Sequence, residues 1–72
     1  MQKKREVSAV VSDIIAIRKR IGMTQKELAN LSGVTRLTIH RIENGETSPT
    51  LSVIINVLDA LGRELKVIHK KK

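Results

Sequence analysis

Four glycines divide the sequence into short apolar runs. Gly22, Gly33, Gly45 and Gly62 each follow a stretch in which apolar residues recur every three or four positions. This step places side chains on one face of an α-helix, and a glycine directly afterwards marks the place where a helix stops. The spacing predicts one small domain of four helices. The four runs cover residues 8–21, 24–33, 35–44 and 51–61.

The segment after Gly62 has a different pattern. Polar and apolar residues alternate over 63–68, which is typical of a short strand, so we expect a strand at 63–69. A lone strand cannot satisfy its own backbone donors and acceptors. The solution that we expect is antiparallel pairing with the same strand of a second copy across a two-fold axis. We expect a flexible basic leader at 1–6 and a solvated basic tail at 70–72.

Composition limits the classes of function. The 72 residues include 14 basic and 7 acidic side chains, and a net charge of +7 suits a polyanionic partner. Cysteine is absent, which excludes disulfides and zinc fingers, and the absence of aromatic residues disfavours modules that stack single-stranded bases. With two histidines and no plausibly paired carboxylates, we expect no enzyme activity, cofactor, metal or small-molecule substrate. Without a spanning segment or export signal, we expect no membrane association and a cytoplasmic location.

The second and third runs form a helix-turn-helix pattern. Thr24 and Glu27 make a capping box at the start of the second run, and Leu28, Ala29 and Leu31 are expected to face inward. Only three residues, 32–34, join this run to the next, and they include a glycine that permits the sharp turn. A pair of short helices joined in this way is a common DNA-binding element.

The third run is the candidate recognition helix. When Ile39 and Ile42 face inward, polar residues remain on the outer face together with Leu37, which can contact a thymine methyl group. Arg36 can donate two hydrogen bonds to guanine O6 and N7. The predicted base contacts are Arg36, Leu37, Thr38 and Arg41.

Residues 24–62 closely resemble the phage-repressor or Cro-type helix-turn-helix family, also called the XRE family. The resemblance covers about residues 14–62, and the ending is similar to the small HipB-like antitoxins, in which C-terminal strands pair between protomers. It implies a lambda-repressor-like all-α bundle, sequence-specific duplex DNA binding as a dimer, and transcriptional repression. The matching residues are Thr24-Gln25, Glu27-Leu28-Ala29, Gly33-Val34, Ile39, Ile42-Glu43-Asn44-Gly45, Pro49 and Leu58 through Leu61-Gly62.

Further site residues follow from this resemblance and from the chemistry of their positions. Gln25 matches a residue that touches backbone phosphate in the family, and Arg18 and Glu43 match a partly buried ion pair that sets the angle of the recognition helix. Free amides at a helix N-terminus also suit an anion. The predicted phosphate contacts are Thr24, Gln25, His40 and Asn44.

The fourth run supports a dimer. Its apolar residues span about half of the helix circumference, which is wider than the usual ~100° stripe of a surface helix. The surplus residues need a second surface, so a two-fold pair of chains would present two recognition helices about 34 Å apart to a near-palindromic operator. The predicted interface residues are Val53, Ile55, Val57, Leu65 and Val67.

The leading functional hypothesis is a dimeric repressor of double-stranded DNA that is an antitoxin, regulates its own toxin-antitoxin operon and binds a toxin protein. One alternative is a stand-alone XRE-type regulator without a toxin partner. Another is a protein-interaction module that does not bind DNA. Salt-dependent binding to duplex DNA separates the last alternative from the other two.

Overall fold

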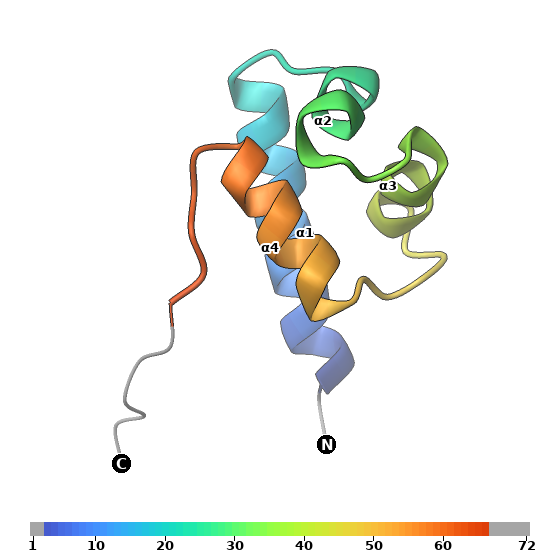
Figure 1. The fold of residues 1–72 in the computed structure, drawn as a ribbon. Coiled ribbons are helices and arrows are strands. Elements are labelled where there is room, and N and C mark those ends of the chain that lie inside the picture. The colour runs from blue at the N-terminus through green and yellow to red at the C-terminus, as the bar shows by residue number, and fades with distance from the viewer. Residues whose placement is uncertain (1–2, 67–72) are drawn as a thin grey trace.

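The computed structural model describes the backbone of residues 3–66 and the side chains of residues 7–66 (Figure 1). The described part contains four α-helices and no strand, which confirms the predicted all-α class. Helix α2 packs against both α3 and α4, and α1 packs against α3. The helices are α1 (Lys3–Arg20), α2 (Gln25–Ser32), α3 (Arg36–Glu43) and α4 (Leu51–Ala60).

Helix α1 begins earlier than the apolar periodicity predicts. It starts at Lys3 rather than near residue 8, so residues 3–6 of the expected flexible leader are helical. The apolar pattern marks only the part of a helix that packs on a core, and the helix extends further because lysine, arginine and glutamate have high helix propensity. Helix α1 therefore begins four residues before the predicted domain boundary at residue 7, and that boundary stays a prediction.

The described part of the predicted C-terminal strand, residues 63–66, is not a strand in the single chain. Residues 63–66 follow α4 without strand hydrogen bonds, since no other strand lies within residues 3–66 to pair with them. Residues 67–69 of that expected strand, and the tail at 70–72, lie outside the described residues. Pairing with a second copy therefore stays a prediction.

A threonine stands at the start of each of the three shorter helices. The hydroxyl oxygens of Thr24, Thr35 and Thr50 accept hydrogen bonds from the third amide of α2, α3 and α4 at 3.0, 3.1 and 3.1 Å. Helix α2 carries the predicted capping box, because Glu27 Oε1 also accepts from the Thr24 backbone amide at 2.8 Å. That hydrogen bond holds the pKa of Glu27 below its usual value. Each threonine cap stabilises its helix by about 1 kcal/mol.

The turn between α2 and α3 depends on Gly33. This residue ends α2 in the left-handed region, with φ of +75°, and its amide donates to the Ala29 carbonyl at 3.0 Å. Glycine adopts this conformation without the steric cost that other residues incur. The chain can therefore reverse within three residues and place α3 across α2.

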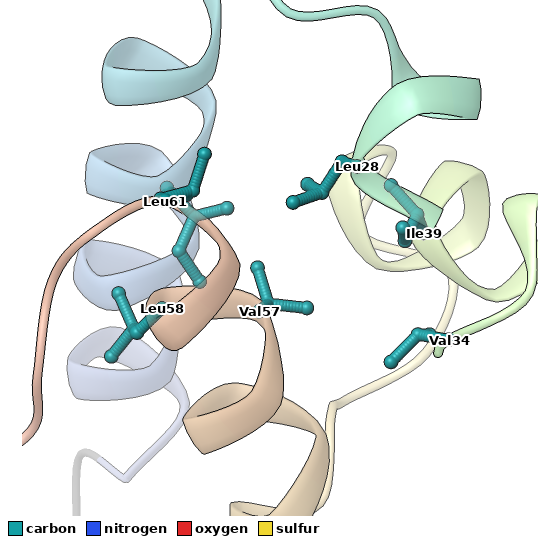
Figure 2. Close-up of a cluster of buried hydrophobic side chains, with 7 residues drawn as sticks. Leu28, Val34, Ile39, Val57, Leu58 and Leu61 are labelled. Carbon is teal, nitrogen blue, oxygen red and sulfur yellow. The ribbon is translucent and has the colours of Figure 1, made fainter. Parts of the chain in front are cut away.

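A single apolar core joins the helix-turn-helix to α4. Leu28 of α2 is completely buried, and Ile39 of α3 and Val57 of α4 are each less than 5% exposed. Figure 2 shows Val57 of α4 and Leu28 of α2 pointing toward each other across this core. The prediction that Ile39 and Ile42 face inward is confirmed. Because α3 is anchored through these residues, its opposite face is left at the surface.

One residue expected inside lies outside. Leu31 at the end of α2 is 63% exposed, although it lies one turn after Leu28. Helix α2 ends one residue later at Ser32, and neither α3 nor α4 covers this corner of the molecule.

No helix within residues 3–66 is long and apolar enough to cross a membrane.

Candidate nucleic-acid interface

The exposed face of α3 carries a mixture of positive charge and one large apolar side chain. Arg36, His40 and Arg41 are exposed, and Leu37 is 55% exposed between them. An exposed leucine costs solvation free energy unless a partner covers it. Two arginines and a histidine around one aliphatic side chain form a surface that can contact both phosphates and a thymine methyl group.

A shallow groove separates this face from the start of α2. Four side chains line it, and they are Gln25, Arg36, Leu37 and His40. The groove therefore brings together two predicted phosphate contacts, Gln25 and His40, with two predicted base contacts, Arg36 and Leu37. They come from two helices that are separate in sequence, and the tight turn at residues 33–35 makes them neighbours.

Thr38, the third predicted base contact, is placed differently from Arg36 and Leu37. Its side chain is half-buried, and its hydroxyl oxygen accepts a hydrogen bond from the Thr35 hydroxyl at 2.8 Å. The Thr38 hydroxyl keeps its own proton, because it is the acceptor in that bond. It can still donate to DNA, but only from the edge of the exposed face.

Arg18 and Glu43 make the ion pair that the family resemblance implies. Arg18 Nε donates to Glu43 Oε2, and Nη2 donates to Oε1, both at 2.7 Å. Arg18 also donates through Nη1 to the Met23 carbonyl at 2.8 Å. The two side chains are 10% and 7% exposed, so this two-pronged pair links α1 to the end of α3 inside the protein.

Gln25 is a third member of this network, and sequence reasoning did not find it. Its Nε2 donates to Glu43 Oε1 at 2.9 Å. Burial alone would raise the pKa of Glu43, but the hydrogen bonds from Arg18 and Gln25 outweigh this effect and hold the pKa below its usual value. The only signal was the chemistry of a buried carboxylate, which has about four acceptor sites, of which a two-pronged arginine fills two.

This network bears on the role predicted for Gln25. One amide hydrogen of Gln25 is committed to Glu43, while the other remains for an outside acceptor. Thr24 lies beside it at the start of α2, where the first backbone amides of the helix have no partner within the helix. The predicted phosphate contacts Thr24 and Gln25 therefore lie together at one helix end, and that end is fixed to α3 through Glu43.

The other two predicted phosphate contacts touch each other. His40 Nε2 and Asn44 Nδ2 are 3.0 Å apart at the end of α3, and Asn44 Nδ2 also donates to Glu46 Oε2 at 3.5 Å. Asn44 is the C-cap of α3, and its backbone amide donates to the His40 and Ile42 carbonyls.

The predicted dimer residues lie in three different environments. Ile55 and Leu65 are 47% and 48% exposed, whereas Val53 is half-buried against the core. Val57 is 4% exposed and points from α4 toward Leu28 and Ile39 (Figure 2), so the prediction that it belongs to surplus apolar surface is wrong. Val67 lies outside the described residues.

Sequence reasoning also missed an exposed residue on α4. Leu51 is 62% exposed and lies one helical turn before Ile55, on the same face of the helix. The apolar arc of α4 gave no reason to separate Leu51 from the core, because burial depends on which helices lie nearby.

Across residues 3–66, no group of His, Cys, Asp or Glu side chains could hold a metal ion.

Comparisons with known proteins agree with this arrangement. A model of the helix-turn-helix family matches residues 14–68. A Haemophilus influenzae protein named an uncharacterized HTH-type transcriptional regulator is 38% identical over 60 residues, which cover 83% of this chain and 61% of that protein. A protein of the same name from Methanothermobacter thermautotrophicus is 51% identical over 47 residues, which cover 65% of this chain and 68% of that protein.

A solved structure named a toxin-antitoxin module from Streptococcus pneumoniae has a similar fold. Its TM-score is 0.77 and its sequence identity 36%, over 96% of this chain and 76% of that one. The chain spans less than two thirds of the length of the Haemophilus influenzae relative. The family match covers most of the chain, and it includes both helices that line the groove. The chain belongs to the XRE-type helix-turn-helix family of transcriptional regulators.

Proposed function

We propose that the protein is a dimeric repressor that binds a specific sequence of double-stranded DNA through α3. The observation that carries this proposal is the exposed face of α3, on which Arg36 and Leu37 line the groove shared with α2 and Arg41 is exposed one helical turn after Leu37. Helix α3 enters the major groove with its N-terminal turn first, so Arg36 and Leu37 meet the base edges before Arg41 does.

The start of α3 and the start of α2 have different roles in DNA binding. Arg36 donates two hydrogen bonds to a guanine, and Leu37 contacts a thymine methyl group, so these residues supply sequence discrimination of about 1–3 kcal/mol per good contact. Thr24 and Gln25, beside the free amides of the first turn of α2, hold a backbone phosphate. Phosphate contacts set the position of the protein on the duplex and carry no sequence information.

The Arg18–Glu43–Gln25 network prepares this surface for DNA. Glu43 lies at the end of the recognition helix, where a free carboxylate would repel the phosphates. Its pairing with Arg18 neutralises that charge, and its bond to Gln25 fixes the start of α2 relative to α3. The phosphate-binding and base-contacting residues therefore keep one geometry, which reduces the ordering cost of binding.

A second copy of the chain is the partner that fits the face of α4. Residues 42–62 contain no lysine or arginine and only three acidic residues, so repulsion between the cationic side chains of two copies of net charge +7 is absent there. Leu51 and Ile55 provide exposed apolar surface within this stretch.

The face of α4 needs a second element to complete a stable interface. The helix has ten residues and is about 15 Å long, too short to bury the ~800 Å² per partner of a standard interface. Leu65 and the segment at 63–69 add the remaining contact in this proposal, by pairing with the same segment of the second chain.

We further propose that the protein is a cytoplasmic antitoxin that represses its own toxin-antitoxin operon. The similarity to a structure named a toxin-antitoxin module supports this role. Co-expression with the product of the adjacent reading frame tests it, because the antitoxin must form a complex with that product and relieve growth arrest. If no adjacent product binds, the stand-alone regulator is the correct alternative.

Duplex binding at several salt concentrations tests the proposed DNA function. With a duplex pool enriched by the protein, log K should fall linearly with log salt, with a slope of about −0.9 per phosphate contacted. Basic side chains neutralise these phosphates, and two copies of a chain with net charge +7 that each expose Arg36 and Arg41 on α3 predict a slope of several units. If no duplex from such a pool shows salt-dependent binding, the protein-interaction module replaces the repressor.

A further inference from the structure

His40, Asn44 and Glu46 form a chain of side-chain hydrogen bonds at the end of the recognition helix. His40 Nε2 and Asn44 Nδ2 are 3.0 Å apart, and Asn44 Nδ2 lies 3.5 Å from Glu46 Oε2. All three residues are exposed, so none of these bonds is needed to satisfy a buried group. Hydrogen bonds between side chains on a binding face can instead fix the orientation of the side chain that contacts a ligand.

The Glu46 carboxylate determines which atoms donate and which accept in this series of side-chain hydrogen bonds. A glutamate carboxylate accepts hydrogen bonds, and the Asn44 amide nitrogen, not its oxygen, lies 3.5 Å from Glu46 Oε2, a long contact that favours this orientation of the amide. The same nitrogen then faces His40, and His40 Nε2 must accept from it. A ring nitrogen that accepts carries no proton, so this arrangement puts the ring proton on Nδ1.

We propose that His40 contacts operator DNA as a neutral imidazole that donates through Nδ1–H, and that Asn44 and Glu46 are the positioning residues that fix this tautomer. His40 lines the groove with Gln25, Arg36 and Leu37, which is the surface assigned to DNA. Since Nε2 is occupied by Asn44, Nδ1–H is the one polar group of the ring that remains for a ligand. This inference rests on the proposed function.

A fixed donor restricts what His40 can recognise. Nδ1–H pairs with an acceptor, which in DNA is a phosphate oxygen or a base-edge acceptor such as guanine N7 or thymine O4. It does not pair with the amino group of cytosine, which is a donor. The contact therefore adds affinity without adding positive charge, unlike the contacts of Arg36 and Arg41.

Nitrogen-15 NMR of the imidazole rings in the free protein tests the tautomer without DNA. Spectra at pH 8 of the wild type and of His69→Gln assign the signals of His40, because His69 is the only other histidine. We expect the Nδ1–H pattern for His40. In Asn44→Asp the new carboxylate can only accept, so the proton should appear on Nε2.

Two results of the NMR experiment overturn the inference. One is a wild-type His40 that shows the Nε2–H pattern or an even mixture of the two tautomers. The other is an Asn44→Asp variant whose His40 pattern is unchanged. A merely structural role of Asn44 as the helix C-cap would alter stability but would not move the proton between ring nitrogens.

Two substitutions of His40 test the contact with DNA. The amide nitrogen of asparagine occupies about the place of Nδ1, whereas that of glutamine reaches the place of Nε2. His40→Asn should therefore bind the operator within about threefold of the wild type, and His40→Gln should lose roughly 3- to 10-fold, the worth of one hydrogen bond. Equal losses in the two variants overturn the inference.

The source of the acceptor follows from the sequences that each protein selects. If His40→Gln weakens binding to all duplexes equally, the acceptor is a phosphate, and if preference is lost at one position per half-site, it is a base. A wild type that binds no duplex refutes the proposed function and with it the DNA contact. The NMR result on the tautomer is independent of that outcome.

Discussion

At the scale of single residues, the Arg18–Glu43 pair is the most sensitive point of the structure. Arg18 makes three hydrogen bonds from a nearly buried position, and Glu43 accepts from two different residues. A buried pair of this kind contributes little when compared with an apolar replacement of both partners. Loss of one partner is costly because the other charge is left without compensation.

Arg18→Met should lower the free energy of unfolding by about 3–5 kcal/mol, since Glu43 would remain buried with Gln25 as its only side-chain partner. Urea denaturation followed by circular dichroism measures the loss. Lys66→Met is the matched control, because Lys66 lies 3.7 Å from Glu64 in a pair that is 73% and 74% exposed. The control should change stability by less than about 0.5 kcal/mol. Similar losses in both variants would contradict the structural role of the buried pair.

The lowered pKa of Glu43 predicts how the free energy of unfolding depends on pH. The hydrogen bonds from Arg18 and Gln25 outweigh burial and hold the pKa of Glu43 below its usual value near 4.5. A depressed pKa in the folded state stabilises the protein above the unfolded pKa, and this contribution is lost as the pH falls through the folded pKa. Stability should therefore fall between about pH 5 and pH 3.

Glu43→Gln should flatten this decline, because glutamine cannot titrate. Urea midpoints of the wild type and the variant, measured from pH 7 to pH 3, provide the comparison. Some decline should remain in the variant, since the hydrogen bond to the Thr24 amide also lowers the pKa of Glu27. Parallel curves for the two proteins would show that Glu43 is not stabilised in the folded state.

The residue scale is where prediction from sequence was least complete. The Arg18–Glu43 pair was expected only because the chain resembles a known family. Gln25 was missed as its partner because a bond between residues 18 positions apart leaves no mark in helical periodicity. Likewise, the contact between His40 and Asn44 depends on rotamers that the residue types do not determine.

At the scale of elements, the helices were predictable because their signals are local. Threonine caps, a capping box and glycine stops all lie within a few residues of the helix ends that they define. The burial of each helix face was less predictable, since it depends on the other helices. Val57 and Leu51 show the difference, because both belong to the apolar arc of α4 and only the packing of α2 and α3 buries the first.

Helix α4 also provides a test of the proposed dimer with a closely matched control. Leu51 on α4 and Leu31 on α2 are 62% and 63% exposed, so a glutamate at either site should disturb folding to a similar small degree. Leu51→Glu should convert the dimer to a monomer in sedimentation equilibrium, because the substitution places a charge in the proposed interface. Leu31→Glu should remain dimeric.

Two outcomes of this comparison would contradict the proposed interface. One is a wild type that sediments as a monomer, and the other is a pair of variants that behave alike. Truncation after Gly62 separates the two parts of the interface, since it removes Leu65 and the segment at 63–69 while leaving α4 intact.

At the scale of the whole molecule, charge and apolar surface are distributed between different faces. Residues 42–62 hold no basic side chain and three acidic ones, so all 14 basic side chains lie in the rest of the sequence, including the recognition helix. One surface is thus suited to a polyanion and the other to a second copy of the chain. Composition predicted the polyanionic partner, but only the fold shows which faces carry Leu37, Leu51 and Ile55.

In the proposed complex, α3 contacts bases in the major groove while the start of α2 contacts phosphate. Selection of binding sites from a random duplex pool by the wild type, Arg36→Ala and Gln25→Ala tests this division between base and phosphate contacts. We predict that Arg36→Ala loses preference at one position in each half of a two-fold symmetric site, and that Gln25→Ala keeps the preferred sequence while binding all sequences more weakly. An unchanged preference in Arg36→Ala, with wild-type affinity in both variants, would contradict the claim.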